Sequence, residues 1–251
     1  MATYMYTLDR VNLMWNSIAY NNSRKFAFMT LKQRWIHVDR HFDNALQLLN
    51  FINSNSVSDV HVKPLDEGGR EWVIDADFKN YVNKTELMLK INVGATALLL
   101  FFTEMHVHRI MFSGNRGFHM WLKFADGFKI GALKSVREHW YRIFEKPTRL
   151  NMRDIRNGSF AHCMQRAVNM YQDQILQSSK PDELILHFWP DVDKDVFCNP
   201  TKQIRAPFSY NHKGTQFSRC ITQQLLEKIQ KCSTGCSDGG ASTSSISNIT
   251  H

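Results

Sequence analysis

Residues 72–78, Trp-Val-Ile-Asp-Ala-Asp-Phe, limit what this chain can fold into more than any other part of the sequence. Successive side chains of a β-strand point to opposite faces, so the pattern predicts a strand with one apolar face that suits a protein core. The opposite face carries Val73, Asp75 and Asp77. The apolar face consists of Trp72, Ile74, Ala76 and Phe78.

Two carboxylates on one strand face repel each other unless a cation lies between them. Mg²⁺ and Mn²⁺ are cations that prefer such oxygen ligands. In two-metal phosphoryl transfer, two such ions lie roughly 3.5–4 Å apart and stabilise the attacking and leaving oxygens. Asp75 and Asp77 therefore predict a metal–nucleotide site, and the alternative interpretation is a solvated strand face with two incidental acids.

A glycine-containing turn follows the aspartate strand by about one helix. Gly114 and Gly117 predict a tight backbone with positive φ, which leaves backbone amides free to approach a phosphate. Ser113 offers a hydroxyl and Arg116 a fork of donors for phosphate oxygens, while His119 falls on the polar face of the next strand. The alternative interpretation is a hairpin turn with a surface arginine.

A third segment adds further acids and bases. Asp191, Asp193 and Asp195 follow a strand predicted over residues 184–189, and any of the three can complete a metal site that needs a third carboxylate. An acidic turn and a basic loop are also common surface features, so this segment alone does not distinguish a metal site from an ordinary surface. The basic residues that can meet a triphosphate or a template are Arg205, His212 and Lys213.

The remaining pattern predicts one α/β or α+β domain over residues 1–231 and a disordered Ser-, Thr- and Gly-rich tail over residues 232–251. The longest apolar stretch, residues 93–102, is too short to span a bilayer and predicts a buried helix. Helices are expected over residues 8–20, 42–52, 133–145 and 151–178, and from the aspartate strand to about residue 105. Strands are expected within residues 26–38 and over residues 60–62, 71–78, 109–112, 118–124 and 184–189.

The chain has 31 Lys and Arg against 23 Asp and Glu, a net charge of +8. A basic balance favours a polyanionic partner, because basic side chains that neutralise phosphates release counterions. Five scattered cysteines do not resemble a disulfide framework and fit a reducing compartment. No secretory signal is expected from the first residues, which lack a charged region followed by an apolar run.

In their order, these segments resemble the three motifs of the small catalytic subunit of archaeal and eukaryotic DNA primases. The Asp-x-Asp strand resembles the first motif, and residues 113–119 resemble the second. Asp193 resembles the aspartate of the third motif, because its distance to residues 207–209 fits that family better than Asp191 or Asp195 does. Arg205 matches a basic phosphate-binding position just before residues 207–209.

More closely still, the chain is similar to the late expression factor 1 family, the primase subunits of baculoviruses. This resemblance includes residues 23–30 and 72–78 and covers about residues 6–222. It implies a primase-polymerase fold of the α+β class, with antiparallel sheets, flanking helices and the acids in a central cleft. It also implies a DNA primase, a DNA-directed RNA polymerase that makes short RNA primers on single-stranded DNA for viral DNA replication.

The resemblance assigns a role to each candidate residue. Two ions, Mg²⁺ or Mn²⁺, would be held by Asp75, Asp77 and Asp193 as catalytic metal ligands. The incoming nucleoside triphosphate would be bound by Ser113, Arg116, His119, Arg205 and His212.

The implied partners are single-stranded DNA, an accessory primase subunit similar to late expression factor 2, and viral replication proteins. The implied location is the nucleus of the infected cell, and no association with a membrane is expected.

The sequence departs from the family pattern at several points. Asn115 replaces an arginine common in cellular primases, and the histidine expected after residues 207–209 falls at Asn211, with His212 one place later. Arg40 is a candidate for a basic residue from the N-terminal strands. Structural zinc is not expected, because the cysteine cluster of many cellular primases is not recognisable. The two tail cysteines, without nearby partners, are Cys232 and Cys236.

Two other functions remain open at this point. The first is a different metal-dependent enzyme of nucleic acids, such as a nuclease, since the same acids can serve strand cleavage. The second is a non-catalytic nucleic-acid-binding scaffold that keeps the fold, and whose affinity for DNA does not depend on the aspartates.

Overall fold

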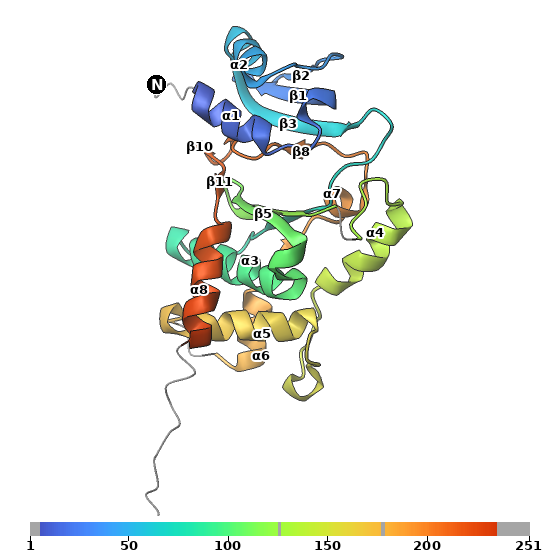
Figure 1. Cartoon of the computed structure of the whole chain (residues 1–251). Helices are drawn as coiled ribbons and strands as arrows, with labels where there is room; N and C mark the ends of the chain where they lie inside the picture. The colour runs from blue at the N-terminus through green and yellow to red at the C-terminus, as the bar shows by residue number, and fades with distance from the viewer. Residues whose placement is uncertain (1–5, 125–126, 177–178, 235–251) are drawn as a thin grey trace, which may run out of the picture.

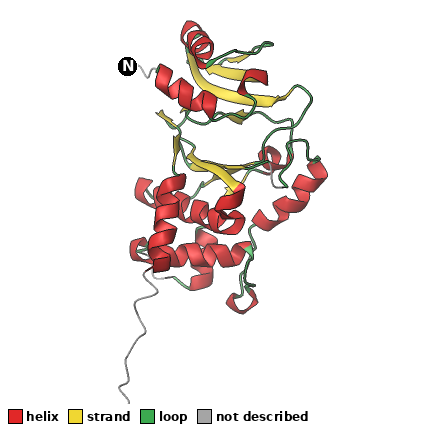
Figure 2. Ribbon diagram, in the orientation of Figure 1, coloured by secondary structure: helices red, strands yellow, loops and turns green. Residues whose placement is uncertain are grey.

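In the part of the chain that the structure describes, helices flank two large antiparallel sheets and a small two-stranded one (Figure 1, Figure 2). The computed structural model of the chain describes residues 6–124, 127–176 and 179–234. The α+β class predicted from the sequence, with antiparallel sheets and helices beside them, is confirmed.

The first sheet comes mostly from the N-terminal quarter of the chain. Its strand order is β2-β1-β3-β8, and the last strand arrives from the C-terminal part. Phe26 and Phe28 alternate with polar or small residues and pack with Phe42 against the two helices, α1 (Leu8–Asn16) and α2 (Ala45–Ser54). The strands are β1 (Arg24–Thr30), β2 (Trp35–His37), β3 (Val57–Leu65) and β8 (Ile204–Arg205).

The second sheet has the strand order β11-β5-β6-β4-β7, and each neighbouring pair is antiparallel. The aspartate strand, β4, therefore lies between β6 and β7. The strands are β4 (Val73–Asp77), β5 (Val107–Phe112), β6 (Gly117–Leu122), β7 (Asp191–Val192) and β11 (Arg219–Cys220).

Helix α3 (Lys84–His106) packs against β5 and β6, and α5 (Phe160–Met170) packs against α3 (Figure 1). The other helices are α4 (Lys134–Tyr141), α6 (Pro181–His187), α7 (Lys194–Cys198) and α8 (Thr222–Thr234). The described residues also form the 3-10 helices η1 (Asn21–Ser23), η2 (Arg142–Phe144), η3 (Met152–Asp154) and η4 (Gln172–Gln174). Strands β9 (Tyr210–Asn211) and β10 (Gln216–Phe217) form a small hairpin.

The apolar stretch over residues 93–102 lies inside α3, as the sequence predicted. By length and composition alone this helix could cross a membrane, but most of its apolar stretch is buried within the protein. Ile91 and Leu98 are fully buried there, in the same core as Ile74 and Ile110 of the sheet. Helix α3 is therefore the central core helix that supports β4, β5 and β6 from below.

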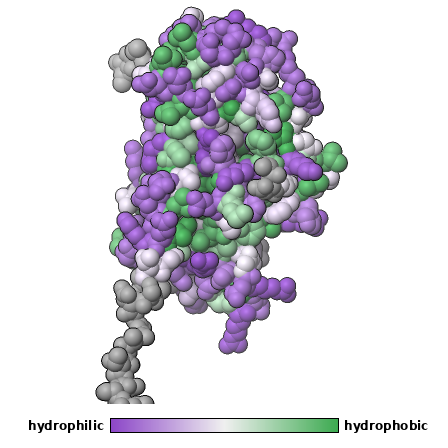
Figure 3. Space-filling model, in the orientation of Figure 1, coloured by the Kyte–Doolittle hydropathy of each residue, from purple (hydrophilic) through white to green (hydrophobic). Residues whose placement is uncertain are grey.

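The predicted apolar face of β4 is confirmed, because Trp72, Ile74, Ala76 and Phe78 all belong to the large core beneath the second sheet. The other face meets a small apolar cluster between the two sheets, in which Val73 packs with residues of β6, α7 and β8. On the face seen in Figure 3, hydrophilic side chains cover most of the first-sheet layer, and hydrophobic side chains gather lower down.

The strand predicted over residues 184–189 is wrong, because these residues belong to α6 and the bend after it. Pro181 occupies the first turn, with acidic residues beside it that favour a helix start. The buried positions Leu184, Ile185 and Phe188 have helical spacing, and so short an apolar run does not distinguish a helix from a strand.

Two other boundaries differ from the prediction. The helix expected over residues 151–178 is interrupted, with α5 flanked by 3-10 turns and loops. Helix α8 continues to Thr234, so Cys232 is helical rather than part of a tail. The rest of the predicted tail, residues 235–251, lies outside the described residues.

Ion pairing at Arg24 joins the two layers. Its side chain is fully buried, and Nη1 donates to both carboxylate oxygens of Glu71, at 3.2 and 3.0 Å. Nε of Arg24 donates to the carbonyl of Lys63 on β3, while Glu71 lies two residues before β4. A buried guanidinium without its carboxylate would be strongly destabilising.

We expect Glu71→Gln to lower the free energy of unfolding by about 3–5 kcal/mol, because it leaves a buried charge on Arg24. Urea unfolding followed by circular dichroism measures the change. Glu67→Gln is the matched control, since Glu67 is exposed in the turn before β4. Equal unfolding midpoints for the two variants would contradict this role of the pair.

Candidate active site

The β4 carboxylates sit at the centre of the second sheet, facing the first. Asp75 lies opposite His119 of β6, and Asp77 lies opposite both Gly117 of β6 and Asp191 of β7. Strand alternation places Asp75 and Asp77 on one face, as the sequence predicted. Both side chains line two adjoining cavities, one of which lies between the sheets.

Each of the two carboxylates has a basic neighbour. Oδ1 of Asp75 is 3.4 Å from Nε2 of His119. Burial alone would raise the pKa of Asp75, but His119, followed by Arg205 and Arg70, outweighs burial and lowers the pKa below its ordinary value. Oδ2 of Asp77 accepts a hydrogen bond from Nε of Arg116 at 2.9 Å. The bases around Asp75 therefore favour its ionised form, and Arg116 forms an ion pair with Asp77.

The turn between β5 and β6 is built as a tight hairpin. Gly114 has φ +80°, as predicted, and the amide of Ser113 donates to the carbonyl of Gly117 at 2.9 Å. Gly117 does not have the positive φ expected from the sequence. Glycine is required there for another reason, since a Cβ atom would overlap the carbonyl oxygen of Ala76 on β4. This close approach places Arg116 beside Asp77.

The three acids of the third segment point in different directions. The backbone amide of Asp193 donates to the carbonyl of Asp75 at 2.8 Å, and its Oδ1 caps α7 by accepting from the amide of Val196. Asp191 pairs with Lys79 at 2.6 Å, whereas Asp195 pairs with Lys202. Asp193 and Asp191 line a cavity with Asp75 and Asp77, and Asp195 does not.

Arg205 is held by a buried acid that sequence reasoning missed. Nη1 of Arg205 donates to Oδ1 of Asp59, and Nδ1 of His212 is 3.0 Å from Oδ2 of the same carboxylate. The Asp59 side chain is only 1% exposed, and the hydroxyl of Ser58 donates to it as well. Burial would raise the pKa of Asp59, but Arg205, Ser58 and His212 together lower it.

Two adjoining cavities share Asp75, Asp77 and Arg116. We name them by the strand beside β4 on their side. The β6-side cavity, of about 250 Å³, lies between the two sheets. It is lined by His61, Asp75, Asp77, Ser113, Asn115, Arg116, His119, Val196, Gln203, Ile204, Arg205, Asn211 and Lys213. The β7-side cavity, of about 430 Å³, is lined by Asp75, Asp77, Lys79, Arg116, Tyr141, Asp191, Val192, Asp193 and Lys194.

These cavities bring together most of the residues predicted from the sequence. Ser113, Arg116, His119 and Arg205 all line the β6-side cavity. His212 does not line it and is linked to it through Asp59, which pairs with both His212 and Arg205. Arg40 is not among the lining residues and instead lies over the rings of two phenylalanines in the first layer. The predicted acidic cleft is a mixed one, because basic side chains line it as well.

Besides Asp59, sequence reasoning also missed His61. It comes from the predicted strand over residues 60–62 and lies opposite Arg205 in the β3–β8 pair. Burial, with the nearby charge of Arg205, lowers the pKa of His61 to about 3, so its imidazole is neutral at ordinary pH. Alternation within β3 shows which residues share a face with His61. Only the pairing of β3 with β8 shows that this residue lies beside Arg205 in the site.

The donor set suits hard divalent cations. Asp75, Asp77 and Asp193 offer carboxylate oxygens to one cavity, and such oxygens are the ligands that Mg²⁺ and Mn²⁺ prefer. Within residues 6–124, 127–176 and 179–234, no three His, Cys, Asp or Glu side chains are already grouped as metal ligands. Arg116 occupies Oδ2 of Asp77, so an ion here would share this carboxylate with Arg116 or displace it.

Comparison with known proteins gives two close relatives. The chain is 60% identical over 236 residues to a protein described as "DNA primase" from Autographa californica nuclear polyhedrosis virus, covering 94% of this chain and 88% of the relative. It is also 60% identical over 242 residues to "Late expression factor 1" from Orgyia pseudotsugata multicapsid polyhedrosis virus, covering 96% of this chain and 98% of the relative.

Family profiles and solved structures were also compared with the chain. No protein-family profile matches the chain. The polymerase domain of Mycobacterium tuberculosis ligase D in complex with DNA is similar over 89% of this chain and 87% of that chain, at 12% identity and a TM-score of 0.46. The two viral relatives are sufficient, and the chain belongs to the baculovirus family that includes late expression factor 1 and this DNA primase.

Proposed function

We propose that this chain is the catalytic subunit of a DNA primase, which synthesises short RNA primers on single-stranded DNA for viral DNA replication. The observation that carries the proposal is the β6-side cavity, where two strand-borne carboxylates meet Arg116 and Arg205. Carboxylates for metal ions and fixed guanidinium groups for phosphates are what nucleotidyl transfer requires. The relative described as a DNA primase supports the same reaction.

In this proposal Asp75, Asp77 and Asp193 hold two Mg²⁺ or Mn²⁺ ions, which would activate the attacking 3′-hydroxyl and stabilise the leaving pyrophosphate. Arg116 turns from Asp77 to the triphosphate as the nucleotide enters. Arg205 binds the same triphosphate from the first sheet, held in place by Asp59. Ser113 and His119 add a hydroxyl and an imidazole from the β5–β6 hairpin.

In this scheme His212 acts indirectly, without contacting the nucleotide. It pairs with Asp59, which also holds Arg205, so it supports the orientation of that arginine. Lys213 next to it lines the β6-side cavity directly and offers a further cation to a triphosphate or to the template. The net charge of +8 suits a single-stranded DNA template.

We further propose the partners and location that such an enzyme needs. An accessory primase subunit, similar to late expression factor 2, would support initiation, and other viral replication proteins would act beside it. Work on viral DNA would take place in the nucleus of the infected cell. The relatives support the family on which these proposals rest, and their names state neither the partners nor the location.

A nuclease with the same acids is the competing enzyme. The basic groups of the β6-side cavity favour primer synthesis, because Arg116, Arg205 and Lys213 converge on a space that can take a triphosphate. The test is incubation with single-stranded DNA, labelled ribonucleotides and Mn²⁺ or Mg²⁺. Labelled primers are expected, and loss of template strands without incorporation would overturn the proposal.

We expect Asp75→Asn and Asp77→Asn each to reduce primer synthesis by at least about 100-fold, since each removes a metal-binding charge. The rate of labelled nucleotide incorporation measures the effect, and circular dichroism checks the fold. Asp9→Asn, at an exposed position of α1, is the matched control and should keep full activity. Wild-type rates in the Asp75 and Asp77 variants would rule out catalysis at this site.

Asp59→Asn should raise the KM for the incoming nucleotide by about tenfold, with a smaller effect on kcat, because Arg205 loses the carboxylate that orients it. Steady-state incorporation at varied nucleotide concentration separates the two constants. A loss of kcat with unchanged KM would show that Asp59 does not act through nucleotide binding.

A further inference from the structure

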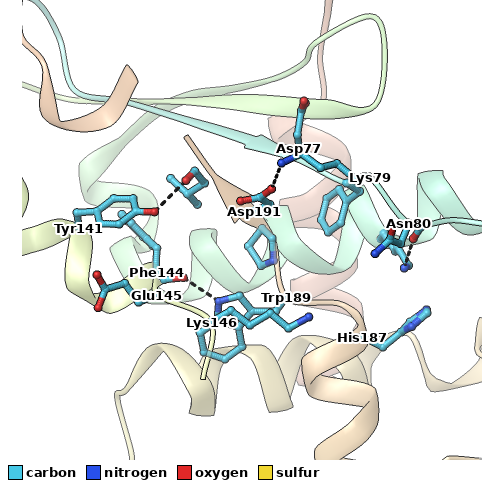
Figure 4. A pocket seen from close by; sticks show the side chains of 14 residues that line it. Asp77, Lys79, Asn80, Tyr141, Phe144, Glu145, Lys146, His187, Trp189 and Asp191 are labelled. Atoms are coloured by element: carbon cyan, nitrogen blue, oxygen red, sulfur yellow. Dashed lines mark hydrogen bonds and ion pairs between the residues drawn. The ribbon is translucent and has the colours of Figure 1, made fainter. Parts of the chain in front are cut away.

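The β7-side cavity continues into another pocket that the proposed roles leave unused. This pocket, of about 260 Å³, shares Asp77, Lys79, Tyr141, Asp191 and Val192 with the β7-side cavity. We name it the α4–α6 pocket, because the segments that follow α4 and α6 line it with Phe144, Lys146 and Trp189. The rest of the lining is Phe78, Asn80, Lys90, Glu145, His187 and Pro190. Figure 4 shows the pair of Lys79 and Asp191 above it.

The walls of the α4–α6 pocket combine lysines and aromatic rings with the exposed carboxylate of Glu145. Lys79 pairs with Asp191 at 2.6 Å, and the exposed Lys146 has no hydrogen-bond or ion-pair partner among the described residues. Trp189 is buried and donates from Nε1 to the carbonyl of Phe144, which fixes the apolar wall. The hydroxyl of Tyr141 donates to the carbonyl of Val192. A ligand with phosphates and a flat, partly apolar body matches this lining.

The strand order places this pocket opposite the phosphate-binding residues. Ser113, Arg116 and His119 come from the β5–β6 hairpin, on one side of β4. Asp191 of β7 and the α4–α6 pocket lie on the other side. In phosphoryl transfer the attacking and leaving oxygens lie roughly in line across the phosphorus. If the pyrophosphate leaves toward the β6 side, the attacking hydroxyl must come from the β7 side.

We propose that the β7-side cavity and the α4–α6 pocket bind the nucleotide that supplies the attacking 3′-hydroxyl. This inference rests on the proposed function and adds the place of the second substrate. Lys146 contacts a phosphate of that nucleotide. Lys79 contacts the same phosphate after it exchanges its ion pair with Asp191 for the nucleotide. Trp189 and Phe144 form the apolar wall behind them.

The step itself needs no further reactant. The 3′-oxygen of the nucleotide in the β7-side cavity bonds to the α-phosphorus of the incoming triphosphate and loses its proton to solvent. The bond from that phosphorus to the bridging oxygen breaks, and pyrophosphate leaves through the β6-side cavity. The first dinucleotide depends most on the α4–α6 pocket, because the initiating nucleotide has no annealed primer to hold it.

Dinucleotide synthesis tests the proposal, on a single-stranded DNA template whose first two complementary nucleotides differ. The concentration of each nucleotide is varied while the other is saturating. Lys146→Ala should raise the KM for the initiating nucleotide by about tenfold and leave the KM for the incoming nucleotide unchanged. Lys146→Arg should keep the wild-type value, and Lys146→Glu should raise it further.

Lys231→Ala, which removes the same charge from the exposed end of α8, is the matched control and should behave as wild type. Wild-type KM values for both nucleotides in Lys146→Ala would overturn this inference alone. Equal increases in both KM values would also overturn it, since they indicate a general effect of charge. A wild-type chain that forms no product would overturn the proposed function together with it.

Discussion

The repulsion between the two carboxylates of β4 is the interaction on which the rest of the site depends. Asp75 and Asp77 share one face of a strand, and each is balanced by a base from β6 or the turn before it, His119 and Arg116. On the other side, Lys79 balances Asp191. These ion pairs line the cavities, and a metal-bound nucleotide can replace them because it brings both cations and anions.

Two separately packed layers place these charges face to face. The first layer has its own core under α1 and α2, and the second has the large core around α3. Strand β8 connects them, since it leaves the second layer after α7 and pairs with β3 of the first. That crossing brings Arg205 to Asp59 and His61, opposite the β4 acids. The buried pair of Arg24 and Glu71 ties the layers together at the other end.

Local patterns made part of this site predictable. Alternation along residues 72–78 placed Asp75 and Asp77 on one face, and the glycine turn placed Arg116 near them. Asp59 and His61 were not predictable, because their roles depend on the pairing of β3 with a strand from far along the chain. Gly117 was identified for its conformational freedom, whereas close packing against Ala76 requires it. The error over residues 184–189 arose because a short apolar run fits either a helix or a strand.

The central claim is that the β4 carboxylates form a metal–nucleotide centre, and the location of bound Mn²⁺ tests it most directly. Crystals of the chain with Mn²⁺ and a non-hydrolysable ribonucleoside triphosphate would show the ions by anomalous scattering. We predict ions bound by Asp75 and Asp77, a triphosphate against Arg205, and Arg116 released from Asp77. A bound triphosphate with no ion at these two carboxylates, or one that leaves the Arg116–Asp77 pair intact, would contradict the account.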